Sequence, residues 1–153
     1  MANDNVTISV RRIKEQSFTI NESLYVSEPN KTLSIQIGMQ LGFSIQTNLL
    51  TLITIAYYHY PGSVEMITNI QVQNIFEISD LKQFLVSETE IKLPSTIITK
   101  LVDLSISHTR ALLAKNISGT VIQENILPIT DPKQMAMNFF PTMFEPEVEQ
   151  VSK

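Results

Sequence analysis

The stretch LLTLITIAYYHY, residues 49–60, constrains the fold more than any other part of the sequence. A strand with one face in water alternates apolar and polar residues, because successive side chains point to opposite faces. Here both sets are apolar, since one contains Leu50 and Tyr58 and the other contains Ile53 and Ile55. The stretch predicts a central strand with two apolar faces, and a single domain of 153 residues has one core with which to cover them.

Three further segments have the pattern of strands. Residues 6–20, 33–46 and 64–78 alternate apolar and polar side chains, and a polar interval near Lys14 to Gln16 predicts a bulge in the first of them. Gly38 and Gly42 predict bends or bulges in the second. Pro61 and Gly62 suit the central positions of a type II turn. The first half of the chain is therefore expected to form a four-stranded antiparallel sheet.

The second half changes to a helical period. Pro94 is expected at the start of a long helix that ends near Gly119. One broad stripe is expected to face the core, and it consists of Ile97, Leu101, Leu104, His108, Ala111 and Leu112. A second apolar stripe lies nearly opposite the first and consists of Val102, Ile106 and Leu113. A surface helix needs one stripe, so the second is predicted to be an oligomer interface.

A short C-terminal helix is expected after the long one. Asp131 and Pro132 suit its N-cap and first position, and Pro141 ends it. The acidic segment 145–153 is predicted to be a disordered tail. The fold class is therefore α+β, with residues 1–153 forming a single domain in which an antiparallel sheet is followed by a long helix and a short helix.

The composition argues against an enzyme. The chain has no cysteine, and its two histidines, His59 and His108, lack metal-ligand spacing to each other or to acidic residues. Ser105 lies one turn before His108, but no acid is placed to orient such a pair, so a packed helix histidine is the preferred interpretation. No phosphate-binding loop is present. No catalytic residue, metal or cofactor is predicted.

Charge and hydropathy exclude further classes. The net charge of −4 and scattered basic residues predict no nucleic-acid binding. The longest apolar run is too short for a membrane-spanning helix, which predicts no membrane insertion. The first residues contain no signal-peptide pattern, so a cytoplasmic location is expected.

Apolar residues near breaks in the pattern are the remaining candidate site. Leu24, Tyr25 and Val26 lie in the first crossover. A second group lies around the last helix and consists of Met135, Met137, Phe139, Phe140, Met143 and Phe144. Each group is compatible with packing on the chain's own core. Flexible methionines and aromatic residues also suit an adaptable groove that repacks against different partners.

Several stretches resemble the SecB-type protein-export chaperones. VTISVRRIKEQSFTI is similar to the first strand of that family, and NIQVQNIFEISDL is similar to its signature strand, with Asn74 where the family usually has glycine. The helix LPSTIITKLVDLSISHTRALLAKNISG followed by NILPITDP is similar to the family's long helix and the segment after it. The resemblance covers residues 5–140.

This resemblance implies a molecular chaperone of protein transport. The family binds unfolded proteins without ATP in grooves lined by the crossover and the last helix, and it forms a homotetramer, a dimer of dimers with the long helices between two sheets. Residues carried over as client contacts are Leu24, Tyr25, Val26, Phe76, Met135, Met137 and Phe139. Glu22 and Glu28 are carried over as contacts to the SecA motor.

Two alternatives stay open at this point. The partner of the chaperone is either a range of export clients or one dedicated protein such as an antitoxin, because both kinds of groove have the same composition. A protein of another class, a non-enzymatic oligomeric scaffold, would use the extra apolar surface for assembly alone.

Overall fold

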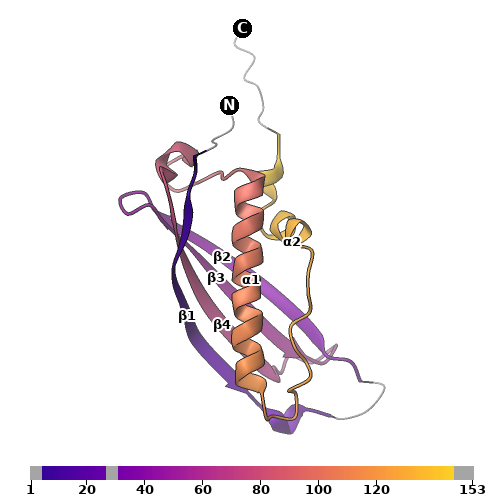
Figure 1. The fold of residues 1–153 in the computed structure, drawn as a ribbon. Helices are drawn as coiled ribbons and strands as arrows, with labels where there is room; N and C mark the ends of the chain where they lie inside the picture. Colours follow the sequence, from indigo (N-terminus) through magenta and orange to yellow (C-terminus); the bar gives the residue numbers. More distant parts are fainter. Residues whose placement is uncertain (1–4, 27–30, 147–153) are drawn as a thin grey trace.

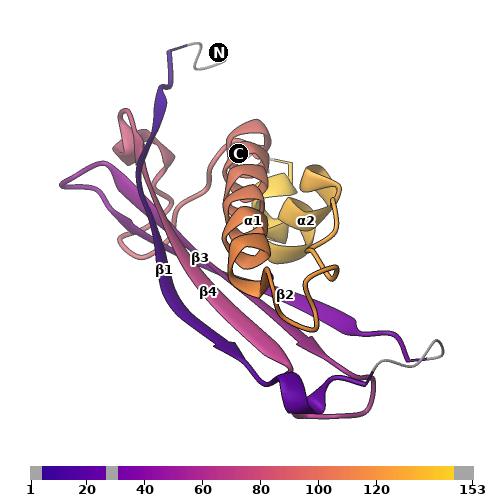
Figure 2. The ribbon, with the colours of Figure 1, turned by 60° about the horizontal axis from the view of Figure 1, so that its bottom comes forward.

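The computed structural model describes residues 5–26 and 31–146 and confirms the predicted α+β architecture (Figure 1). The strands are β1 (Ile8–Ile20), β2 (Ser34–Ser44), β3 (Leu49–His59) and β4 (Thr68–Ile78). The helices are α1 (Ser95–Ile117) and α2 (Pro132–Phe139), and the short 3-10 turns are η1 (Glu22–Leu24), η2 (Leu81–Phe84) and η3 (Pro141–Phe144). Figure 2 shows both helices on one face of a curved sheet. The predicted tail lies outside the described residues from position 147 onward.

The four strands form one antiparallel sheet in the order β1-β4-β3-β2. Its register shifts in β1 between Val10 and Arg12 and between Glu15 and Ser17, and the second shift confirms the predicted bulge. In β2 the register runs without a break from Ser34 to Ser44, so the bends or bulges predicted at the two glycines of this strand do not occur.

The turn between β3 and β4 has the expected geometry. Gly62 has a φ of +82°, which glycine adopts without the steric cost that a side chain would bring. The amide of Ser63 donates to the carbonyl of Tyr60 at 3.0 Å and closes the turn. The predicted type II turn is therefore in place, although β4 begins at Thr68, later than the sequence pattern suggested.

The two apolar faces of β3 are covered in different ways. Leu50, Leu52 and Tyr58 point toward α1 and are fully buried. Ile53 on the other face is only half-buried, and it pairs with Gln40 of β2 and Gln73 of β4. Directly opposite residues on neighbouring strands lie in contact range, so these long polar side chains shield the apolar strip between them. The outer face of the sheet thus needs no second layer of secondary structure.

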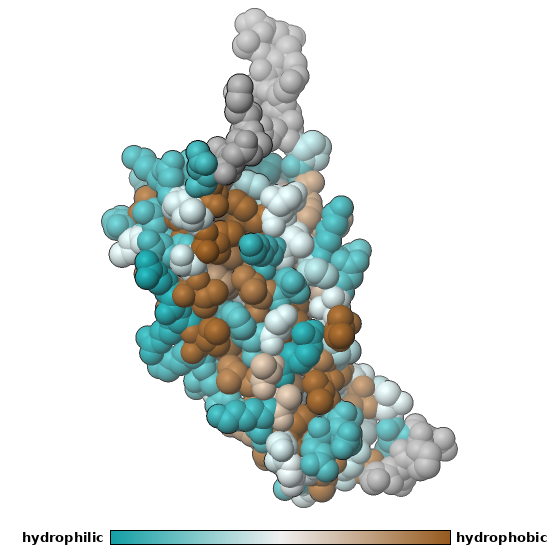
Figure 3. Space-filling view, in the orientation of Figure 1, coloured by the Kyte–Doolittle hydropathy of each residue, from teal (hydrophilic) through white to brown (hydrophobic). Residues whose placement is uncertain are grey.

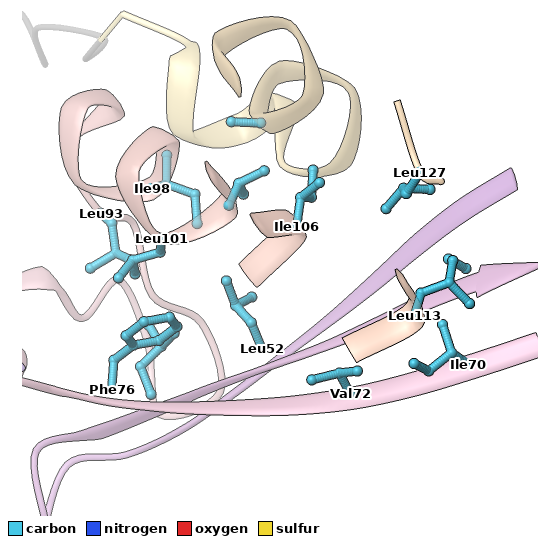
Figure 4. Packing of buried hydrophobic residues seen from close by; sticks show 14 of the residues in the cluster. Leu52, Ile70, Val72, Phe76, Leu93, Ile98, Leu101, Ile106, Leu113 and Leu127 are labelled. Carbon is cyan, nitrogen blue, oxygen red and sulfur yellow. The ribbon is translucent and has the colours of Figure 1, made fainter. Parts of the chain in front are cut away.

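The predicted assignment of the two stripes on α1 is correct for Leu101, which is fully buried, but wrong for the second stripe. Val102, Ile106 and Leu113, predicted as an oligomer interface, have exposed fractions of 0%, 1% and 0% within the single chain. Figure 4 shows Leu113 beside Ile70 of the sheet, whereas Ile106 lies on the side of α1 that faces α2. These side chains belong to the chain's own core and offer no surface to a partner.

The physical reason lies in two small polar residues between the stripes. Ser105 and Thr109 are both fully buried and occupy the centre of the face that α1 turns to the sheet. The Thr109 hydroxyl donates to the Ser105 carbonyl at 2.8 Å, so burial does not leave it without a partner. Sequence reasoning centred the core on the broader apolar stripe, whereas the buried face of α1 is centred on these two small residues, with Leu101 on one side and Ile106 on the other.

Candidate functional site

The crossover between β1 and β2 is fixed through a tyrosine that sequence reasoning missed. The hydroxyl of Tyr60, at the end of β3, accepts a hydrogen bond from the Val26 amide at 2.7 Å and donates to the Val26 carbonyl at 3.1 Å. Leu24, Tyr25 and Val26 are all partly buried, and the first two pack against the core. These apolar side chains of the crossover therefore keep a minor part of their surface in solvent, and Tyr60 fixes the backbone at Val26.

Glu22 connects the crossover to the chain that follows α1. One oxygen of its exposed carboxylate accepts a hydrogen bond from the Val121 amide at 2.9 Å. This contact places η1 beside the C-terminal end of α1. Glu28, the other residue carried over as a motor contact, lies outside the described residues.

The helix α2 begins as the sequence predicts. The Asp131 side chain accepts from the amides of Lys133 and Gln134 at 3.0 and 3.2 Å and caps the helix. Ala136 is the buried residue of α2, whereas Met137 is 40% exposed. Met135 and Phe139 are partly buried. Of the three predicted contacts on α2, Met135 and Phe139 are therefore partly accessible to solvent, and Met137 is exposed.

The described part of the crossover and the start of α2 lie near opposite ends of α1. Near α2, Lys133 lies with Ser95 and Thr99 around a shared hollow, which places the start of α2 at the first turn of α1. The crossover instead contacts the chain just beyond the other end of α1. Because α1 has 23 residues, these ends are about 35 Å apart. Figures 1 and 2 agree with this separation.

A connecting segment, residues 121–131, runs along α1 between these two places (Figure 1). It is held by Arg110, whose guanidinium donates to the carbonyls of Leu127 and Pro128, each at 2.9 Å. Leu127 is buried and anchors the segment to the core. Ile122 is buried in the same way, so the backbone position is fixed at two points while Val121, Ile126 and Ile129 face solvent.

Exposed apolar side chains follow this segment from the crossover to α2. Val121 is 53% exposed, Ile126 is 50% exposed and Ile129 is 91% exposed, and Met137 of α2 continues the series. We call these four residues the apolar track. Sequence reasoning missed its first three members because an extended segment without periodicity gives no signal of which side chains are covered. The only feature of the sequence that pointed to these three residues was that valine and isoleucine occur in a segment not assigned to the sheet.

Phe76 is not a client contact. It is fully buried and lies beneath Leu101 and near Leu93, as Figure 4 shows. The resemblance placed it correctly in the signature strand, but its position in β4 points toward α1, opposite Leu50 of β3. A residue in the middle of the core contributes to stability and cannot reach a bound chain.

His108 pairs with the asparagine that replaces the family's usual glycine. Its Nδ1 lies 2.6 Å from the Oδ1 of Asn74, which is fully buried in β4. Desolvation by burial lowers the pKa of His108 below its ordinary value of 6.5. The Ser105 hydroxyl is buried without a hydrogen-bond partner among the described residues, so it does not form a nucleophile pair with this histidine.

A second apolar surface lies on the opposite side of α1, toward β1. Leu104 and Leu112 are partly buried there, and Val10 and Ile13 of β1 are 45% and 44% exposed. Ile13 pairs with Asn74, the partner of His108, which places this part of β1 beside the same face of α1. Figure 3 shows apolar side chains gathered between β1 and α1. We call this surface the α1–β1 face.

Within the described residues, no group of three or more histidine and acidic side chains is placed to hold a metal ion. In the same part of the chain, no helix combines the length and the apolar character needed to cross a membrane.

Comparison with known proteins gives one kind of match. No family model and no curated protein matches the sequence. Among solved structures, the chain is similar to a SecB-like chaperone from Mycobacterium tuberculosis in complex with a ChAD peptide from the HigA1 antitoxin. The TM-score is 0.57 at 8% sequence identity, and the match covers 80% of this chain and 90% of the other. At this identity the likeness concerns the fold, and the fold of this chain is SecB-like.

Proposed function

We propose that the protein is an ATP-independent chaperone that holds unfolded or extended polypeptides on the apolar track. The observation that carries this proposal is the series Val121, Ile126, Ile129 and Met137, which leaves apolar side chains exposed on a segment whose backbone is fixed by Arg110. Exposed apolar side chains that lie in a row mark a binding surface more often than isolated ones do. The SecB-like fold, shared with a chaperone that was solved with an antitoxin peptide, supports the same function.

A dedicated polypeptide partner, such as an antitoxin, is the preferred form of this function. The similar structure contains a single antitoxin peptide, which is the support for this choice. Delivery of export clients to a SecA motor would use acidic surface near the crossover. Glu22 is exposed there, but its carboxylate already accepts a hydrogen bond from Val121, so a motor would have to compete for it. Both forms place the protein in the cytoplasm.

Self-assembly would use the α1–β1 face in place of the buried stripe. Burying the exposed 44% of Ile13 against a second copy would contribute about 1 kcal/mol, and the smaller exposed part of Leu104 would add less. The assembly expected for a SecB-like fold is a homotetramer in which α1 lies between two sheets. This face also supports the alternative class, a scaffold that assembles and binds no unfolded chain.

The test compares binding of an unfolded polypeptide to three forms of the protein. A fluorescent, reduced and carboxymethylated polypeptide should bind the wild type without ATP, and it should bind Ile129→Glu with Met137→Glu at least about tenfold more weakly. Ile13→Glu is the control, since it places a negative charge on a partly exposed apolar residue of the α1–β1 face. Equal weakening by all three substitutions, or no binding to the wild type, would contradict the proposal and favour the scaffold.

A further inference from the structure

The two edges of the sheet are built differently. The β1 edge is interrupted by two register shifts, and it carries Arg11, Arg12 and Lys14 as exposed charges. Bulges and charges of this kind prevent another strand from pairing with an edge. The β2 edge has 11 residues, SIQIGMQLGFS, with no charge, no proline and an unbroken register. Every residue of β2 keeps some exposure to solvent. Only β2 therefore has the properties of an edge that accepts a further strand.

The direction of the free backbone groups on β2 follows from the hydrogen bonds of β3. The carbonyl of Tyr58 accepts from the Ile67 amide at 2.8 Å, and the carbonyl of Asn48 accepts from the Ile78 amide at 2.9 Å. Even-numbered residues of β3 therefore face β4, and odd-numbered ones face β2, because the direction alternates along a strand. The odd-numbered residues pair with even-numbered residues of β2, such as Tyr57 with Gln36.

The remaining residues of β2 direct their backbone groups away from the sheet. They are Ile35, Ile37, Met39, Leu41 and Phe43. Among the described residues, none of their amides or carbonyls has a hydrogen-bond partner beyond β3. This free row spans about 27 Å from Ile35 to Phe43, since a strand rises about 3.4 Å per residue. These backbone amides and carbonyls are free hydrogen-bond donors and acceptors with the spacing that a neighbouring β-strand requires.

The side chains of the same residues point to the face on which α1 and α2 lie. Ile37 pairs with Ala56 and Leu41 pairs with Leu52, and both partners are buried under the helices. Figures 1 and 2 place α2 and the connecting segment on the side of α1 away from β1. A strand added at β2 would direct alternate side chains to this face. Those side chains would lie on the side of the sheet that carries the connecting segment and α2 (Figure 2).

We propose that the edge of β2 binds an extended segment of the held polypeptide as a fifth strand of the sheet. This inference rests on the proposed function and names its substrate class, an extended segment with few charges and with apolar side chains at alternate positions. Backbone hydrogen bonds supply affinity without regard to sequence, and the apolar track selects the alternate side chains.

Amide hydrogen exchange on deuterated protein, followed by NMR, tests the proposal. The probe is a synthetic peptide as long as β2, with alternating valine and threonine and lysines at both ends. Bound peptide should slow exchange at least about tenfold at Ile37, Met39 and Leu41, which lack partners. Gln36 and Gln40 should change little, because their amides already donate to β3. The same peptide N-methylated at alternate residues along one edge should lose this protection.

A proline substitution supplies the second arm. Met39→Pro removes one outward amide and places a ring on the free edge, and prolines are tolerated on edge strands. Met39→Ala is the matched control, because it removes the same side chain and keeps the amide. The proline variant should bind the peptide at least about tenfold more weakly than the alanine variant. Circular dichroism establishes that both variants are folded.

The outcomes separate this inference from the proposed function. If an unfolded polypeptide binds the apolar track but the exchange of Ile37, Met39 and Leu41 stays unchanged, binding is through side chains alone and the inference is wrong. If these amides are protected without peptide in a concentration-dependent manner, a second copy occupies the edge, and the inference is again wrong. If neither the peptide nor an unfolded polypeptide binds at all, both proposals fail.

Discussion

The burial of Ile106 gives the sharpest test of how α1 packs. Its side chain is 1% exposed, whereas Leu104, two positions earlier on the same helix, is partly exposed on the α1–β1 face. Changing isoleucine to alanine removes three carbon atoms, or about 2.4 kcal/mol at roughly 0.8 kcal/mol per carbon. The cavity left beside α1 adds to this, so Ile106→Ala should lower the free energy of unfolding by about 2 to 5 kcal/mol.

Urea unfolding followed by circular dichroism measures this difference. Leu104→Ala should lower the free energy of unfolding by about 1 kcal/mol or less at a protein concentration where assembly is negligible, because part of its side chain is already in water. Light scattering at higher concentration should show a smaller assembly for Leu104→Asp, which stays folded, whereas Ile106→Asp should not fold. A decrease of less than about 1 kcal/mol in the free energy of unfolding for Ile106→Ala would contradict the burial of Ile106 in the core. A folded and dissociated Ile106→Asp protein would contradict it as well.

Three further changes have defined outcomes. Burial lowers the pKa of His108 in the folded state, so the unfolded chain takes up the proton first as the pH falls. The free energy of unfolding should therefore decrease as the pH drops below about 6.5. His108→Gln should reduce this pH dependence in denaturation curves measured between about pH 7 and 5.5. Asp131→Ala should cost about 0.5 to 2 kcal/mol of stability through the lost cap, and a smaller loss in urea unfolding would mean that α2 does not depend on it. Tyr60→Phe removes both bonds to Val26 and should accelerate exchange of the Val26 amide while the exchange of β3 stays slow; unchanged exchange would show that the crossover is held elsewhere.

The sheet and the helices could be predicted from the sequence because their signals are local. Alternation gave all four strands, and Asp131 with Pro132 gave the start of α2, since caps and periods depend only on neighbouring residues. Which stripe of α1 enters the core depends on tertiary packing and not on neighbouring residues in the sequence. Ser105 and Thr109 are polar, so the sequence did not indicate that both are buried, and Val102, Ile106 and Leu113 beside them were therefore not assigned to the core.

The candidate site was predictable only in part, for a similar reason. The apolar residues of the crossover and α2 were identified from composition, yet the sequence could not show that the length of α1 holds them apart. The exposure of Ile126 and Ile129 could not be predicted from the sequence, because it depends on Arg110 fixing the backbone that carries them. The contrast between the edges also depends on the strand order, because β2 is an edge only in a sheet ordered β1-β4-β3-β2.

Aggregation of a heat-denatured protein in the presence of this chain, without ATP, tests the central claim most directly. A holding chaperone should suppress light scattering at near-stoichiometric amounts, and Ile129→Glu with Met137→Glu should abolish most of the suppression while Ile13→Glu retains it. The account is contradicted if the wild type leaves the scattering unchanged at a severalfold excess, or if the charges on the apolar track have no more effect than the charge on the α1–β1 face.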